Sequence, residues 1–157
     1  MQPDDPKLTW EDLIIDNVTP DEAAEWLGHW DWLVSGRMYP VFLSRFGNWF
    51  LQRPDGSTVL LDVHDGIVEQ VAPTPDAFAA AVNTPDWQEQ YLYSALLMRY
   101  RRQGLAARDR DLIAFAPHPA LVTSIDACTP MVMHVRVWQA ICAQTLRPPG
   151  TGGSTNP

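Results

Sequence analysis

The sequence has few of the features that mark a secreted, membrane-spanning or metal-dependent protein. Its 157 residues include two cysteines, Cys128 and Cys142, which are too few for a disulfide scaffold and lack the spacing of a zinc site. No apolar run approaches the roughly 18 residues that cross a membrane, and the N-terminus has no apolar signal-peptide core. We therefore expect a cytoplasmic protein with reduced thiols and no membrane contact.

Catalytic motifs are also missing. The sequence contains no G-x-S-x-G turn, no Walker A loop and no G-x-G-x-x-G loop. None of the four histidines (His29, His64, His118 and His134) lies at a metal-ligand spacing from another histidine or from a cysteine. We therefore expect no catalytic residue, no metal ion and no cofactor.

Negative charge is the strongest imbalance in the composition. The net charge is −8, and residues 1–31 carry nine acids against one base, so the whole surplus lies in the N-terminal fifth of the chain. An acidic surface repels nucleic acid and attracts basic proteins. A solvated helix face is the plainer interpretation, and a docking surface for a basic protein partner is the sharper one.

Tryptophan is concentrated in the same region. Four of the seven tryptophans lie between residues 10 and 32, and aromatic anchors inside an acidic rim are typical of protein-binding surfaces. Core packing is the alternative role for these side chains. The candidate partner-binding residues are Asp12, Asp16, Asp21, Glu22, Glu25, Trp26, Trp30 and Asp31.

The segment "FGNWFLQRPDGSTVLLDVHDG", residues 46–66, combines aromatic and β-branched runs with two Asp-Gly turns. Asp62 and His64 lie two residues apart and therefore on one face of a strand, so with Asp65 they could form an acid–base site. No neighbouring motif supplies a further partner for that chemistry. The alternative is a strand end whose polar face meets solvent, while Leu61 and Val63 point to the core.

Helix starts are marked by Thr-Pro pairs, because threonine caps a helix and proline suits its first position. This signal predicts a helix at 19–28, a helix that starts at Thr74 and Pro75, and a single helix across 84–104. A closing helix at 136–146 is expected to turn three apolar side chains toward the core, namely Val137, Ile141 and Leu146.

Short turns force neighbouring strands to be antiparallel, so residues 39–72 are predicted to form a central β-meander. The expected fold class is α+β, with an antiparallel sheet of about five to six strands and helices packed mainly on one face. The expected organisation is a flexible N-terminus (1–7), one domain (8–146) and a disordered C-terminal tail (147–157). Composition alone does not set the oligomeric state.

One wider pattern runs through residues 39–146. The pattern begins with an apolar strand that ends at a Phe-Gly pair. After it come an aromatic strand, an Asp-Gly turn, a strand containing Leu-Leu-Asp, and a helix that carries an aromatic residue. The matching positions are Phe46, Gly47, Asp55, Gly56, Leu60, Leu61, Asp62, Gly66 and Phe78. This pattern resembles a bacterial domain-of-unknown-function family found at the C-terminus of immunity proteins that are paired with type VI secretion DNase effectors. Asn48 stands where that family has an aspartate, and Val122-Thr123 stand where it has two glycines.

The resemblance implies a non-enzymatic immunity protein that binds a cognate toxin and neutralises it by occlusion. Two alternatives stay open. One is a regulatory or chaperone-like binding module for an unknown protein or small ligand. The other is an enzyme that uses Asp62, His64 and Asp65.

Overall fold

An antiparallel five-stranded sheet forms the centre of the molecule. The computed structural model describes residues 7–149, so the expectations for residues 1–6 and 150–157 lie outside the described residues. The sheet has the order β1-β2-β3-β4-β5, and its strands are β1 (Ile14–Ile15), β2 (Tyr39–Ser44), β3 (Trp49–Gln52), β4 (Thr58–Asp62) and β5 (Ile67–Ala72). This order confirms the meander predicted for residues 39–72. A separate two-stranded sheet pairs β6 (Asp111–Ala116) with β7 (Thr129–His134).

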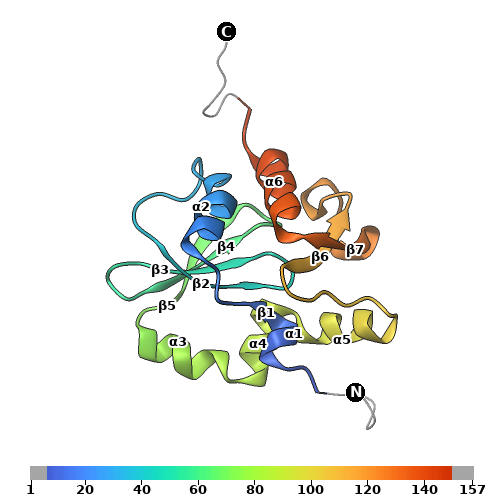
Figure 1. Cartoon of the computed structure of the whole chain (residues 1–157), viewed down its shortest axis with the longest axis horizontal. Coiled ribbons are helices and arrows are strands. Elements are labelled where there is room, and N and C mark those ends of the chain that lie inside the picture. The colour runs from blue at the N-terminus through green and yellow to red at the C-terminus, as the bar shows by residue number, and fades with distance from the viewer. Residues whose placement is uncertain (1–6, 150–157) are drawn as a thin grey trace.

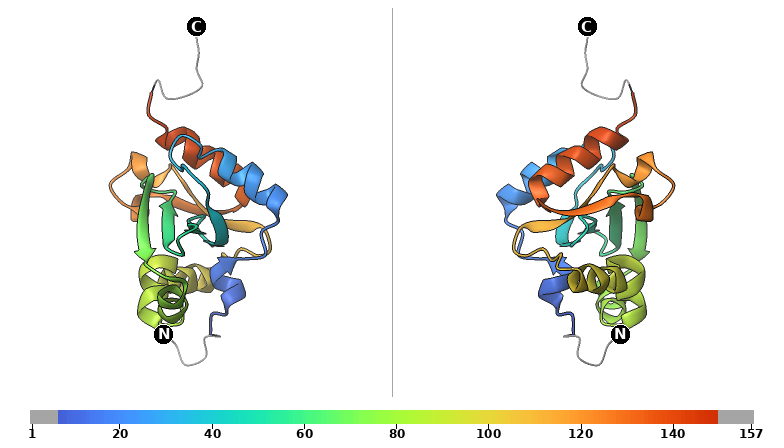
Figure 2. Two further views of the ribbon diagram at one scale, coloured as in Figure 1. Left: turned by 90° about the vertical axis from the view of Figure 1, so that its left-hand side faces the viewer. Right: turned by 90° about the vertical axis from the view of Figure 1, so that its right-hand side faces the viewer.

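Helices cover both faces of the five-stranded sheet (Figure 1). On one side lie α2 (Pro20–Gly28) and α6 (Val135–Leu146). On the other side lie α3 (Pro75–Val82), α4 (Pro85–Leu92) and α5 (Ser94–Arg102), and the short α1 (Trp10–Leu13) leads into β1. Two 3₁₀ turns, Pro119–Leu121 and Ile125–Ala127, connect β6 to β7. The α+β class is as predicted, but the helices form two layers, one on each side of the sheet, and do not lie mainly on one face (Figure 2).

Two neighbouring residues of β3 explain why both faces need a cover. Trp49 and Phe50 are fully buried, and successive side chains of a strand point to opposite faces. The Trp49 ring lies 6.4 Å from that of Trp26 in α2, whereas the Phe50 ring lies 5.3 Å from that of Trp87 in α4. All five residues of β4 are buried as well. A strand that is apolar on both faces requires a layer of helices on each.

The Thr-Pro starts behave as predicted. The Thr19 hydroxyl accepts a hydrogen bond from the Glu22 N–H at 3.1 Å, and the Glu22 carboxylate accepts one from the Thr19 N–H at 3.0 Å. Thr74 and Thr84 cap α3 and α4 through their side chains in the same way. Local capping chemistry therefore fixes where three of the helices begin.

The helix expected across 84–104 is interrupted at Tyr93. This residue has φ 54°, in the left-handed region, and it separates α4 from α5. The Glu89 carboxylate accepts hydrogen bonds from the Ser94 hydroxyl at 3.0 Å and from the Ala95 N–H at 2.8 Å, so it satisfies the first donors of α5. The Tyr93 ring meets Phe46 edge-on, with centroids 5.5 Å apart. This tertiary contact and the Glu89 cap explain a break that the helical spacing of the sequence does not predict.

The prediction for the core face of α6 is wrong for two of its three residues, whereas the third, Leu146, is partly buried against the core. Val137 and Ile141 are 42% and 36% exposed, respectively, and the buried residues of α6 are Val135, Trp138, Gln139, Cys142 and Ala143. Gln139 explains this rotation of the helix. Its carbonyl oxygen accepts hydrogen bonds from the indole N–H groups of Trp30 at 2.7 Å and Trp49 at 3.0 Å, and its amide donates to the Gly47 carbonyl at 2.9 Å.

Arg45 forms a second buried polar junction. It follows β2 and is 3% exposed, and its guanidinium donates to the carbonyl oxygens of Glu11, Asp109 and Asp111 at 2.8–2.9 Å. The Ile113 N–H of β6 donates to the Arg45 carbonyl at 2.8 Å. One side chain therefore joins the end of β2 to α1 and to the second sheet. Burial lowers the pKa of this guanidinium, while the charges of Asp109, Asp12 and Glu11 oppose that shift.

The replacement Gln139→Leu is expected to destabilise the protein strongly. It leaves two indole donors and the Gly47 carbonyl buried without partners, and each such group costs about 1–3 kcal/mol. The expected loss in the free energy of unfolding is about 3 kcal/mol or more, measured by urea denaturation. Gln144→Leu, an exposed site on the same helix, is the control and should change stability by less than about 0.5 kcal/mol. Equal losses in the two variants would contradict this role of Gln139.

Candidate partner-binding surface

Two of the predicted interface acids are engaged inside the molecule. Asp12 pairs with Arg101 at 3.0 Å. Glu22 accepts hydrogen bonds from two nitrogens of Arg110, both at 3.0 Å. The Arg110 hydrogen bond is the main reason that the pKa of Glu22 lies below its ordinary value. Arg110 also donates to the carbonyl oxygens of Asp16 and Asn17, at 3.1 and 3.0 Å. These acids therefore help to attach the N-terminal segment to the rest of the fold.

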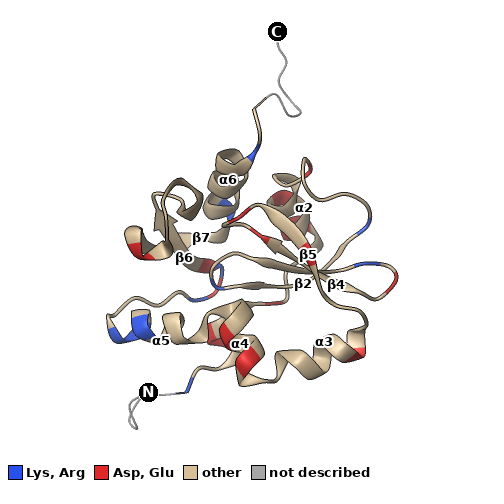
Figure 3. Cartoon of the chain, turned by 180° about the vertical axis from the view of Figure 1, so that it is seen from behind, with Lys and Arg blue, Asp and Glu red and all other residues tan. Residues whose placement is uncertain are grey.

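The other four predicted acids, Asp16, Asp21, Glu25 and Asp31, are exposed. We call them the α2 acidic strip: Asp21 and Glu25 lie in α2, Asp16 precedes the helix and Asp31 follows it. Asp21 and Glu25 are four residues apart and therefore lie on the same side of α2, and Figure 3 shows acidic residues on this helix. Glu25 makes only a 4.0 Å contact with Arg136 between two well-exposed side chains. Within residues 7–149, no lysine or arginine forms an ion pair with the other three acids.

The two predicted tryptophan anchors are core residues, so this part of the prediction is wrong. Trp26 is 2% and Trp30 is 0% exposed. The Trp26 ring packs against Trp49, and the Trp30 indole donates to Gln139. Their four-residue spacing is that of one apolar helix face, which is the signal for core packing, although α2 ends at Gly28, before Trp30. Trp32, which the sequence did not single out, is only partly buried and lies beside Trp30, with ring centroids 5.8 Å apart.

A surface hollow of about 330 Å³ lies next to Asp16. Its walls include Glu11 and Asp109, two exposed acids that sequence reasoning did not select. No local signal marks Asp109, because the fold alone brings it beside the N-terminal segment. Asn17 and Asp109 both have positive φ angles, 53° and 57°, where they border this hollow.

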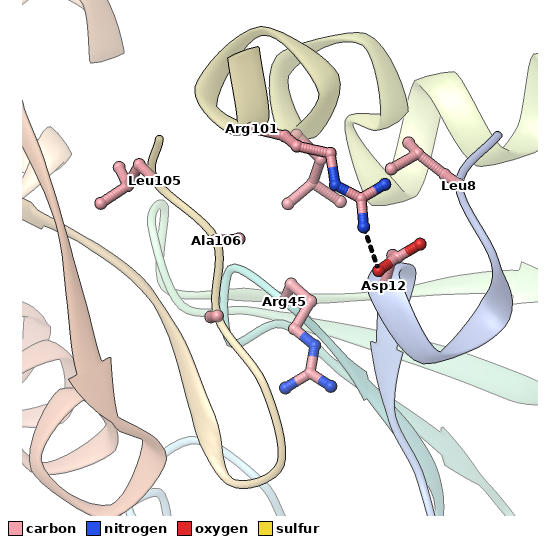
Figure 4. A pocket seen from close by; sticks show the side chains of 8 residues that line it. Leu8, Asp12, Arg45, Arg101, Leu105 and Ala106 are labelled. Atoms are coloured by element: carbon pink, nitrogen blue, oxygen red, sulfur yellow. Dashed lines mark hydrogen bonds and ion pairs between the residues drawn. The ribbon is translucent and has the colours of Figure 1, made fainter. Parts of the chain in front are cut away.

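A second opening, between α5 and the N-terminal segment, is too small for a metabolite (Figure 4). Its volume is about 20 Å³, and its walls include Asp12, Arg45 and Arg101. The Nε of Arg45 and the Nη1 of Arg101 are buried there without a hydrogen-bond partner. A space of this size holds about one water molecule, so it offers no site for a substrate.

In the turn at 62–66 the side chains of Asp62 and His64 are buried, so they do not form the solvent face that the plainer sequence interpretation expected, whereas Asp65 is exposed. Leu61 and Val63 are buried, as that interpretation expected. Asp62 is 9% and His64 is 5% exposed. The Asp62 carboxylate accepts hydrogen bonds from the N–H groups of His64 and Asp65, at 2.8 and 3.0 Å. This pattern is an Asx-type turn, in which aspartate stabilises the backbone that follows it. Gly66, with φ 72°, completes the bend.

The fold does bring a second histidine to this turn. The rings of His64 and His118 lie 6.3 Å apart, and the ring of His64 also contacts those of Phe115 and Trp138. His118 accepts a hydrogen bond from the Ala120 N–H at 3.0 Å, so its other nitrogen carries the proton and donates to the Val63 carbonyl at 2.9 Å. Across residues 7–149, no three His, Cys, Asp or Glu side chains are grouped to hold a metal ion.

No helix in the described part of the chain is long and apolar enough to cross a membrane.

Neither the protein-family models nor the curated proteins contain a match to this sequence.

Stability is expected to fall as the pH drops from about 6.5 to about 4. Burial lowers the pKa of His64 from 6.5 to about 4, the nearby His118 acts in the same direction, and Asp65 opposes them. Between these values the unfolded chain binds a proton that the folded protein excludes, so acid favours unfolding. The full contribution of His64 is about 3 kcal/mol, and urea denaturation at a series of pH values measures it.

The variant His64→Leu should flatten this dependence, and the effect is clearest above about pH 5, where most carboxylates remain ionised. His29→Ala, at an exposed position, is the matched control. An unchanged slope in His64→Leu would show that His64 is not excluded from protonation in the folded state.

Proposed function

We propose that this protein is an immunity protein that binds a basic toxin and neutralises it by covering its active surface. The mechanism is occlusion without chemistry, and no metal or cofactor takes part. The resemblance of residues 39–146 to the immunity-associated family points to a DNase effector of type VI secretion as the toxin. The cytoplasm, where such a toxin attacks DNA and where the two cysteines stay reduced, is the place of action.

The observation that carries this proposal is that the acids fall into two groups, one paired with arginines of the fold and one exposed. Asp12 and Glu22 have arginine partners within the fold, whereas Asp16, Asp21 and Asp31 have no lysine or arginine partner in the part of the chain that the structure describes. Exposed acids without such partners do not stabilise the fold, but they attract a partner of opposite charge and speed its capture. A DNase must carry a basic surface to bind DNA phosphates, and this surface is complementary to the α2 acidic strip.

A binding function agrees better with the surroundings of His64 than catalysis does. His64 has a second histidine nearby, as an acid–base site would need, but its ring is surrounded by Phe115, Trp138 and His118 and is 5% exposed. A general acid or base must reach its substrate within hydrogen-bond distance. A regulatory or chaperone-like module would bind its partner through the same acidic strip. An immunity protein differs from such a module because its bound partner loses activity.

The double variant Asp21→Lys/Glu25→Lys should bind the cognate effector at least about tenfold more weakly, because it turns attraction into repulsion at the strip. The probe is the effector encoded beside this gene, with affinity measured by calorimetry at about 50 and about 200 mM salt. Inhibition of its DNase activity is measured in parallel. The wild type should weaken with added salt more steeply than the variant.

The matched control is Glu69→Lys/Asp76→Lys, which changes the net charge equally at two exposed acids on β5 and α3. It should bind at nearly wild-type strength. Equal weakening by both double variants would show that the strip is not the interface. Tight binding with undiminished DNase activity would favour the chaperone-like alternative.

A further inference from the structure

A surface hollow lies where α2 and α6 end. Its volume is about 310 Å³, which is at the lower end of the range for small-ligand pockets. It is lined by Gly28, His29, Asp31, Trp32, Ala143, Gln144 and Arg147. Asp31 belongs to the α2 acidic strip, so the hollow adjoins the surface already proposed to bind the partner.

The two helices run side by side in the same direction (Figure 1). The ring of Trp26 lies 6.4 Å from that of His134, just before α6, and four residues later Trp30 bonds to Gln139 at 2.7 Å. Both C-terminal ends therefore reach the hollow. A helix C-terminus carries roughly half a negative charge, and the last turns of α2 and α6 contain no basic residue.

The side chains around the hollow add to this negative potential and supply an aromatic surface. Asp31 is exposed and has no ion-pair partner within residues 7–149. The partly buried Trp32 contributes its aromatic side chain to the lining, and its indole N–H is buried without a hydrogen-bond acceptor among residues 7–149. Arg147, directly after α6, is the one arginine or lysine among the described residues that line the hollow, and it offsets only part of the negative potential.

We propose that this hollow receives an arginine side chain of the basic partner. A planar guanidinium can stack on Trp32 while it donates hydrogen bonds to Asp31 and to carbonyl oxygens at the helix ends, each of which has two lone pairs. This inference rests on the proposed function and names the partner group that the acidic surface takes.

The probe is the capped peptide acetyl-Gly-Arg-Gly-amide, followed through the indole N–H signal of Trp32 in two-dimensional NMR. It should shift that signal in a saturable way, whereas the peptide with citrulline in place of arginine should bind at least about fivefold more weakly, because it lacks the charge. Equal shifts with both peptides, or shifts that map elsewhere, would overturn the proposal.

Two single variants then test the sign of the charge. Asp31→Asn should weaken binding of the arginine peptide, and Arg147→Gln should strengthen it, because one removes an attraction and the other a repulsion. The opposite pair of effects, together with preference for acetyl-Gly-Glu-Gly-amide, would make the hollow an anion site. Trp32→Phe keeps an aromatic face and should retain most of the arginine binding.

Measurements with the effector separate this inference from the proposed function. If Asp21→Lys/Glu25→Lys abolishes effector binding while Asp31→Asn and Trp32→Leu leave it unchanged, the acidic interface stands and the arginine hollow fails. If Asp31→Asn and Trp32→Leu weaken effector binding while Asp21→Lys/Glu25→Lys leaves it unchanged, the arginine hollow stands and the proposed interface on α2 fails; if neither group of variants affects the effector, both proposals fail. Chemical-shift spectra of each variant confirm that it is folded.

Discussion

The hydrogen bonds of the buried Gln139 amide are the interaction on which the packing of α2 and α6 against the sheet depends. This amide lies at 0% exposure among apolar side chains, where an unpaired amide would be costly. Its partners come from three separate segments: Trp30 after α2, Trp49 in β3 and Gly47 in the turn before it. Only one placement of α2 and α6 on the sheet satisfies all three, so a single polar group selects that placement among many apolar packings.

The turn at Gly47 is shaped to the same requirement. Gly47 has φ 97°, and a β-carbon at this position would approach Trp138 Cδ1 to 2.9 Å. The Trp138 indole donates to the Phe46 carbonyl at 3.1 Å, next to the bond that Gln139 makes with Gly47. Consecutive residues of α6 thus bond consecutive carbonyls of one turn, and a side chain at position 47 would separate them. The close contact between helix and turn is the reason for glycine here.

Local chemistry made much of the fold predictable. The Thr-Pro helix starts, the Asp-Gly bends and the strands of the meander depend on neighbours in sequence, and all of them appear where the pattern placed them. The uninterrupted apolar run in β4 also indicates that both faces of the sheet are covered. The sequence interpretation nevertheless placed Asp62 and His64 on a face exposed to solvent. Phe115 and Trp138, which bury His64, come from distant elements that no local pattern connects to it.

The wrong predictions have the same cause, namely contacts between residues that are distant in sequence. The apolar spacing of Val137, Ile141 and Leu146 predicted one face of α6, but the hydrogen bonds of Gln139 turn another face inward. Trp26 and Trp30 were chosen because tryptophan is common at interfaces, yet their helical spacing favoured the core. Among the eight proposed interface residues, the sequence could count the acids but could not tell which have arginine partners in the fold, since those arginines lie about ninety positions away.

The distribution of arginine explains how the acidic segment can be both a structural element and a binding surface. Arg101 and Arg110 neutralise the acids that face the body of the protein, and Arg45 uses backbone carbonyls, so it binds the segment without neutralising any carboxylate. The attachment of α1 and α2 therefore leaves the charge of the outer acids intact. Repulsion among like charges opposes folding, and the basic partner proposed above would relieve it on binding. A surface that is electrostatically incomplete on a well-anchored helix is the property that a rapid, specific inhibitor of a basic protein requires.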